Sequence, residues 1–158
     1  MTPNASDPPL VDLTSYNAPN STSTAILTAF GYDFPRPAAP WVFDFAGTGH
    51  FNQARNTWEL LAWGWDECGA EYLVAYETPV APSNVSAGAP AGVDFVSRVK
   101  GGPDARTRAG LVAAVERLGV GELSALVREV VATPVDGRRD GLPPVACDEA
   151  CIDNVAFA

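Results

Sequence analysis

The hydrophobic pattern of this chain is clearest between residues 57 and 99, where it alternates with a period of about two residues. Residues 57–65 (TWELLAWGW) and 71–78 (EYLVAYET) are rich in aromatic and β-branched side chains, which favour strands. The segment between them, DECGA, has the length of a hairpin loop and contains glycine. A third alternating run, VDFVSRV, covers residues 93–99. The pattern predicts a β-hairpin followed by a further strand.

The period changes to that of a helix after residue 102. Leu111, Val115 and Leu118 recur at spacings of four and three residues, which places them on one face of a helix. Gly119 stands where a left-handed C-terminal cap is expected. We therefore predict an amphipathic helix over about residues 104–118. Beyond it, we expect a short helical piece near residues 123–126 and an alternating strand over residues 127–133 (VREVVAT).

The first third of the chain has a weaker pattern. Residues 1–24 contain four prolines and a polar run without a regular period, so we predict an extended arm. Residues 25–45 are apolar but are interrupted by three prolines. We expect a strand on either side of these prolines, which cannot lie in a central strand. The chain then divides into an arm (1–24), a β domain (25–134) and a C-terminal tail (135–158).

Composition and charge narrow the function classes. The chain has 158 residues, 47% of them hydrophobic and 18% charged, which suffices for one domain with a core. Its net charge of −9 disfavours binding to nucleic acid and to anionic membranes. No uncharged apolar stretch reaches the length of a transmembrane segment. We see no leader peptide, so we expect a cytosolic chain, or a secreted or organelle-lumen chain whose targeting segment has been removed.

The serial order of these segments resembles the C-terminal half of a lipocalin. The hairpin WELLAWGWDECGAEYLVAYET is similar to the second conserved block of that family, and FVSRV to the third block, which ends a strand in an arginine. Residues 102–134 are similar to the helix that packs outside the barrel and to the strand after it. Within the calycin superfamily, residues 41–134 most resemble the lipocalin domain of violaxanthin de-epoxidase-like proteins.

The resemblance implies a mainly β fold with one packed α-helix (α+β), which is a partial or lipocalin-like antiparallel β-barrel. A closed barrel of eight strands requires about four or five strands ahead of the hairpin, and the residues before it are too few. The Gly-x-Trp of the first lipocalin strand is also missing from the first third of the chain. We therefore expect an open sheet whose edge is covered by the N-terminal arm or by another protein.

The resemblance further implies a xanthophyll de-epoxidase, but the catalytic positions of that family are not matched. One is an acidic residue on an early strand that is missing here. The other is a tyrosine on the strand before the hairpin, and its position falls at Phe45. A phenyl ring cannot transfer a proton, so we assign no catalytic residue.

Seven aromatic side chains are the candidate contacts for a ligand or a partner protein. The strand period places Trp63 and Trp65 on one face of their strand and Trp58 on the other. Because both faces are apolar, we expect the helix to cover one and a ligand or partner the other. The alternative is that these rings simply fill the core. The set consists of Trp41, Trp58, Trp63, Trp65, Tyr72, Tyr76 and Phe95.

Four charged or titratable residues are further candidates. By the resemblance, Arg98 is the buried structural arginine of the family, and the alternative is an exposed charge on a strand. Asp66 and Glu67 at the hairpin tip either gate a ligand or are ordinary exposed turn residues. His50 is the single histidine, and we expect it at the surface or at a cap.

The three cysteines, Cys68, Cys147 and Cys151, allow at most one intramolecular disulfide. The resemblance implies a bond from Cys68 to one of the other two, which would tie the tail to the hairpin. We expect no metal site, because Cys147 and Cys151 lack a second pair of ligands.

These observations lead to three alternative functions. We expect a non-catalytic lipocalin-like protein that binds an apolar pigment or lipid, such as a carotenoid, or that docks as a subunit of a larger assembly. By the resemblance, that assembly would be photosynthetic. The alternatives are a xanthophyll de-epoxidase-like enzyme and a structural scaffold without a ligand. No cofactor is required, and the partner is an apolar small molecule or a protein that covers the open sheet edge.

Overall fold

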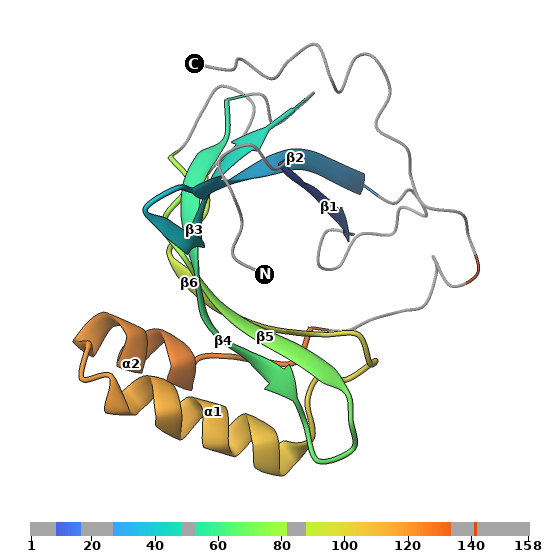
Figure 1. The fold of residues 1–158 in the computed structure, drawn as a ribbon, viewed down its shortest axis with the longest axis vertical. Helices are drawn as coiled ribbons and strands as arrows, with labels where there is room; N and C mark the ends of the chain where they lie inside the picture. The colour runs from blue at the N-terminus through green and yellow to red at the C-terminus, as the bar shows by residue number, and fades with distance from the viewer. Residues whose placement is uncertain (1–8, 17–26, 49–52, 82–87, 134–140, 142–158) are drawn as a thin grey trace. The chain divides into compact units, whose positions relative to one another are not determined.

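The computed structural model describes residues 9–16, 27–48, 53–81, 88–133 and 141. In these ranges six strands are followed by two helices (Figure 1). The strands form one sheet in chain order. The pairs β1–β2, β2–β3, β4–β5 and β5–β6 are antiparallel. The prediction of a mainly β fold with packed helical structure is confirmed at this level. The elements are β1 (Leu10–Tyr16), β2 (Leu27–Arg36), β3 (Ala39–Gly47), β4 (Arg55–Trp65), β5 (Glu71–Glu77), β6 (Gly92–Ser97), α1 (Ala105–Arg117) and α2 (Gly121–Arg128).

The chain forms two compact units. Strands β1 to β3 and the start of β4, through Thr57, belong to the first unit. The rest of β4, β5, β6 and both helices belong to the second. Each unit buries apolar side chains of its own. They include Phe43, Ala46 and Ala54 in the first unit, and Val74, Val93, Leu111, Val115, Leu123 and Val127 in the second.

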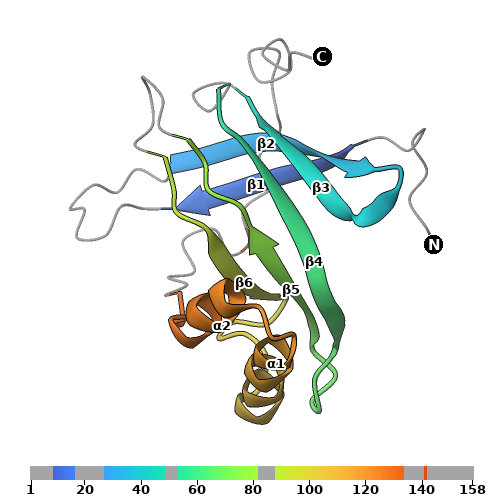
Figure 2. The ribbon, with the colours of Figure 1, turned by 90° about the vertical axis from the view of Figure 1, so that its left-hand side faces the viewer.

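Strand β1 of the first unit lies in the segment that we predicted as an arm, so that prediction is wrong for residues 10–16. β1 pairs with β2 along its whole length, from Leu10 opposite Asp33 to Tyr16 opposite Leu27 (Figure 2). Leu10 and Val11 are both exposed. The strand is therefore held through its main-chain pairing rather than through one buried face, which explains why its sequence shows no alternation.

Strands β2 and β3 extend further into the proline cluster than predicted. Pro35 is still part of β2, although its position is past the last pair with β1, at Asp33. At Pro35 the strand therefore has β3 as its partner on one side, and the missing N–H interrupts no ladder to β1. The register between β2 and β3 also shifts after Pro35. Prolines are accommodated here because this end of β2 is not flanked by β1.

An ion pair links the strands of the first unit. Arg36 donates to both carboxylate oxygens of Asp44, at 2.9 and 2.7 Å. The hydroxyl of Thr57 donates to Asp44 Oδ1 at 2.9 Å, and the hydrogen bond from Arg36 is the main cause that lowers the pKa of Asp44. Asp44 thus connects β2, β3 and the start of β4. The single histidine, His50, lies outside the described residues.

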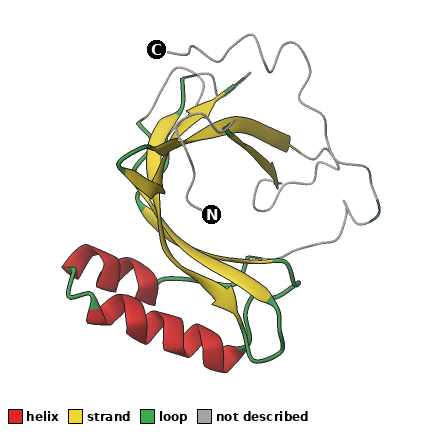
Figure 3. Ribbon diagram, in the orientation of Figure 1, coloured by secondary structure: helices red, strands yellow, loops and turns green. Residues whose placement is uncertain are grey.

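The second unit packs its two helices on one face of β4, β5 and β6 (Figures 1 and 3). Val74 of β5 and Val93 of β6 meet Leu111 of α1 and Val127 of α2 in this core. The hairpin, the strand after it and helix α1 all occur where the sequence predicted them, within two residues at each end.

The strand predicted over residues 127–133 is wrong, and the short helical piece before it is a full second helix. Val127 belongs to the last turn of α2 and is 1% exposed, whereas residues 130–133 have no regular structure. Val127 and Val130 both pack on the core. The two valines are three residues apart, which is a helical spacing. Because a further valine, Val131, follows directly, the segment VREVVAT also resembles a β-rich strand sequence.

Candidate functional site

A bulge in β4 decides which way its tryptophans face. Leu60 is paired with Ala75 of β5, and the next pair is Ala62 with Val74, so the register shifts at Leu61. One extra residue in a strand puts the side chains beyond it on the opposite face from the one that simple alternation gives. The side chains before and after the bulge must therefore be assigned from the register.

The register places Trp58 on the same face as Trp63 and Trp65, which corrects the prediction of opposite faces. Trp58 is paired with Glu77 and Trp63 with Leu73. Leu73 and Glu77 are four residues apart on β5 and so share a face. The β5 residues Val74 and Tyr76, which alternate with them, pack in the core under the helices. The face of the tryptophans therefore points away from α1 and α2.

This face carries an apolar hollow. Trp63 and Trp65 are 69% and 67% exposed, and with Leu60, Leu73 and Val96 they line a hollow of about 400 Å³. We call these five residues the tryptophan face. Its volume lies within the range of small-molecule sites. Contiguous exposed apolar side chains on a small protein often mark a binding site.

The charges at the tryptophan face neutralise each other. Arg98 Nε lies 2.8 Å from Glu71 Oε2, and both residues line the hollow. The Arg98 side chain is 86% exposed and lies just past the end of β6, so it is an exposed charge and not the buried arginine that the lipocalin resemblance implies. The hollow therefore offers an apolar surface beside a compensated ion pair, which suits an uncharged ligand.

The other predicted aromatic contacts lie mostly elsewhere. Tyr72, Tyr76 and Phe95 pack against the core under the helices, and Tyr72 also lines the hollow. The hydroxyl of Tyr76 donates to Glu122 Oε1 of α2 at 3.1 Å, and desolvation is the main cause that raises the pKa of Tyr76. Trp41 belongs to the first unit and is half exposed. The predicted set of seven thus divides into structural rings and a smaller group that faces solvent.

The hairpin turn that joins the tryptophan strand to β5 is built around Asp66. Its Oδ1 accepts hydrogen bonds from the N–H groups of Cys68, at 2.9 Å, and Ala70, at 2.8 Å. Its Oδ2 accepts the N–H of Asp104 at 3.1 Å. Asp66 is 9% exposed, so it neither gates a ligand nor lies exposed as the sequence analysis proposed. An aspartate that bonds main-chain groups two residues ahead is a known turn former, and that signal was available in the sequence.

Asp104 makes the reciprocal contact from the start of α1. Its Oδ1 caps the helix by accepting the N–H groups of Arg106 and Thr107. Its Oδ2 accepts the hydroxyl of Thr107 at 2.6 Å and the N–H of Glu67 at 3.4 Å. The two carboxylates therefore bind the hairpin turn to helix α1, and they fix the strand that carries Trp63 and Trp65.

The cap predicts a pH dependence of stability. The hydrogen bond from the Thr107 hydroxyl is the main cause that lowers the pKa of Asp104 below its ordinary value of 3.8. The stabilisation is therefore present above about pH 4 and is lost as the pH falls through the lower folded-state pKa. We expect Asp104→Asn, which keeps a capping oxygen, to reduce the decline of unfolding free energy between about pH 5 and pH 2 in urea titrations. Thr107→Val should act in the same direction, and an unchanged decline in both variants would contradict this assignment.

The remaining candidates are cysteines and charged groups. Cys68 is exposed, and its two predicted partners, Cys147 and Cys151, lie outside the described residues, so the disulfide stays a prediction. Among the described residues, no three histidine, cysteine or acidic side chains gather as a metal site. No helix in the same ranges is long and apolar enough to cross a membrane.

One known protein is similar in sequence to most of this chain. Over 146 residues, 92% of its length, the chain is 32% identical to "Botcinic acid biosynthesis cluster B protein 12" of Botryotinia fuckeliana (strain B05.10). The match spans 63% of that protein. No family model and no solved structure matches the chain, and the lipocalin resemblance stays a prediction.

Proposed function

We propose that this chain binds an uncharged, apolar small organic molecule on the tryptophan face. The observation that carries the proposal is the pair of exposed indoles, Trp63 and Trp65, beside an apolar hollow on the sheet face that the helices leave uncovered. Each 100 Å² of this surface that a ligand covers contributes about 2.5 kcal/mol. Flat or elongated molecules gain most, because they can contact both indoles at once.

The charge of the site supports an uncharged ligand. The Arg98–Glu71 ion pair leaves no net charge at the hollow, and the whole chain carries −9. An anionic ligand would therefore meet repulsion at long range and no unpaired cation within the hollow. The carotenoid or lipid expected from the sequence belongs to the same uncharged, apolar class.

The relative suggests a biological setting. Its name places that protein in a cluster for the biosynthesis of botcinic acid. We extend this to the present chain as part of the proposal: its ligand is an organic intermediate or product of a small-molecule pathway. The lipocalin-like fold is also part of the proposal, and the chain-order arrangement of the six strands supports it, because up-and-down β-barrels are built in this order.

A pair of fluorescent probes tests the site. N-phenyl-1-naphthylamine is uncharged, and anilinonaphthalene sulfonate has the same skeleton with an added sulfonate. We expect the uncharged probe to bind the protein about tenfold more tightly than its charged analogue. Trp63→Ala and Trp65→Ala should each weaken its binding about tenfold, through the loss of an aromatic contact. Leu118→Ala, at an exposed apolar position outside the hollow, is the matched control and should bind as the original protein does.

Two results would count against this function. Equal affinity for the two probes would remove the argument from charge, and unchanged binding in both tryptophan variants would move the site elsewhere. If the tryptophan variants instead convert an oligomer into a monomer without affecting the probe, the face is a docking surface for a protein subunit. Sedimentation velocity on the same variants distinguishes these cases.

A further inference from the structure

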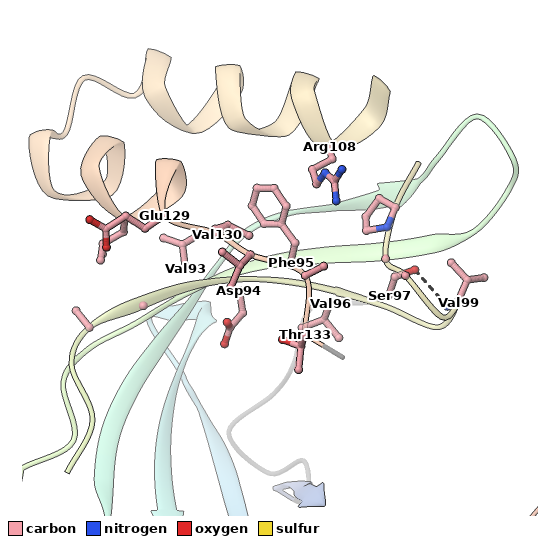
Figure 4. A pocket seen from close by; sticks show the side chains of 18 residues that line it. Val93, Asp94, Phe95, Val96, Ser97, Val99, Arg108, Glu129, Val130 and Thr133 are labelled. Carbon is pink, nitrogen blue, oxygen red and sulfur yellow. Dashed lines mark hydrogen bonds between the residues drawn. The ribbon is translucent and has the colours of Figure 1, made fainter. Parts of the chain in front are cut away.

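A second cavity, of about 620 Å³, follows the outer edge of β6 (Figure 4). All six residues of β6 line it, including Val93 and Phe95 on the helix side and Asp94 and Val96 on the other side. Successive side chains of a strand point to opposite faces, so a cavity that touches both sets must run along the strand edge. Residues 130–133, which follow α2, form the opposite wall. We call this cavity the edge groove.

The edge of β6 is suited to pair with another strand. β6 is last in the strand order, and in the described part of the chain it pairs with β5. Every second residue of an antiparallel edge strand directs its N–H and C=O outward. β6 has the sequence GVDFVS, without the proline or lysine that often protects such an edge. Its six residues offer about 20 Å of main chain.

We infer that the edge groove binds an extended peptide segment of another protein, which adds to the sheet as a strand beside β6. The groove lies where the next strand of the sheet would run. Peptide side chains on the helix side would contact Phe95, Leu126 and Val130, so they must be apolar. Those on the other side would stand near Asp94 and Val96. The ligand therefore alternates apolar with polar residues, as strands with one buried face do.

The charges of the groove favour a basic peptide. Asp94 is exposed on β6, and Glu129 lines the groove at the end of α2. Arg108 is the one cation among the lining residues; in Figure 4 its side chain extends from α1 on the Phe95 side, away from Glu129. A lysine opposite Asp94 would form the cross-strand pair of opposite charges that stabilises antiparallel strands. The edge groove shares Val96 and Ser97 with the hollow of the tryptophan face, but its lining includes neither Trp63 nor Trp65, so the variants that test the two sites differ.

Two labelled peptides test the inference by fluorescence anisotropy. Both are acetylated, amidated and alternating; one has the sequence TVKVTV and the other TVEVTV. The original protein should bind the lysine peptide about threefold to tenfold more tightly than the glutamate peptide. Asp94→Lys should reverse that preference. Leu118→Lys, which adds a cation at an exposed position outside the groove, should preserve it.

The main-chain contribution needs a separate control. Methylation of alternate amide nitrogens of TVKVTV keeps its side chains but removes donors from the ladder. We expect it to weaken binding at least about tenfold, because each lost main-chain bond leaves an acceptor of β6 unpaired. Hydrogen exchange should slow at β6 amides when the unmethylated peptide binds. Failure of both peptides to bind at millimolar concentration, equal binding of the methylated peptide, or an unchanged preference in Asp94→Lys would each overturn the inference.

Discussion

Replacement of Asp66 with alanine is expected to lower the free energy of unfolding by about 3 kcal/mol. The carboxylate accepts hydrogen bonds from three main-chain N–H groups, those of Cys68, Ala70 and Asp104. Bonds to a charged acceptor are worth more than neutral ones, and donors left without a partner add their desolvation cost. Because Asp66 is 9% exposed, water cannot replace all of these bonds in the folded variant. Urea unfolding followed by circular dichroism measures the loss.

The neighbouring residue provides the matched control for this prediction. Glu67 forms an ion pair with Arg106 at 2.8 Å, but both side chains are largely exposed. Exposed pairs contribute between about 0 and 1 kcal/mol, so Glu67→Ala should cost much less. Asp66→Ala should also weaken the binding of N-phenyl-1-naphthylamine, since the turn orients the strand of Trp63 and Trp65. A loss of stability no larger than that of Glu67→Ala would show that the turn does not depend on Asp66.

Local sequence patterns predicted the elements that bury one apolar face, because their apolar residues repeat with the period of a strand or of a helix. The hairpin strands, β6 and α1 each bury one face against the other elements, so their sequences alternate or repeat at helical spacing. β1 was missed because Leu10 and Val11 are exposed in a strand held by main-chain bonds. The strand predicted over residues 127–133 was wrong because the helix pattern of α2 continues through Val127, and the valines after it lie in an irregular segment.

The site was only partly predictable for a different reason. The sequence predicted Trp63 and Trp65 as candidate contacts, but alternation cannot reveal a bulge, and the bulge at Leu61 brings Trp58 to the same face. The contact between Asp66 and Asp104 joins residues 38 positions apart. Each aspartate has a local signal, as a turn former and as a helix cap. Their meeting depends on how α1 packs on the sheet, which no local pattern records.

Gly31→Ala is expected to destabilise the protein by about 3 kcal/mol, through a clash in the first unit. The ring of Phe45 occupies the place where a Cβ on Gly31 would stand, and the carbonyl oxygen of Ala46 is 3.0 Å from that place. The main chain of Gly31 cannot easily move away, because it is paired with β1 on one side and with β3 on the other. The ring must therefore leave its position, and the loss of packing around a large aromatic side chain costs several kcal/mol.

A double-mutant cycle separates this clash from a general intolerance of side chains at strand glycines. In Phe45→Ala the obstructing ring is gone, so adding Gly31→Ala should cost at least about 1 kcal/mol less than in the original protein. Gly64→Ala is the comparison: its Cβ would stand 3.0 Å from the hydroxyl oxygen of Tyr72. That oxygen is the end of a side chain that can shift, so we expect a cost below about 1 kcal/mol. Additive costs in the cycle, or equal costs at the two glycines, would show that Phe45 does not select glycine at position 31.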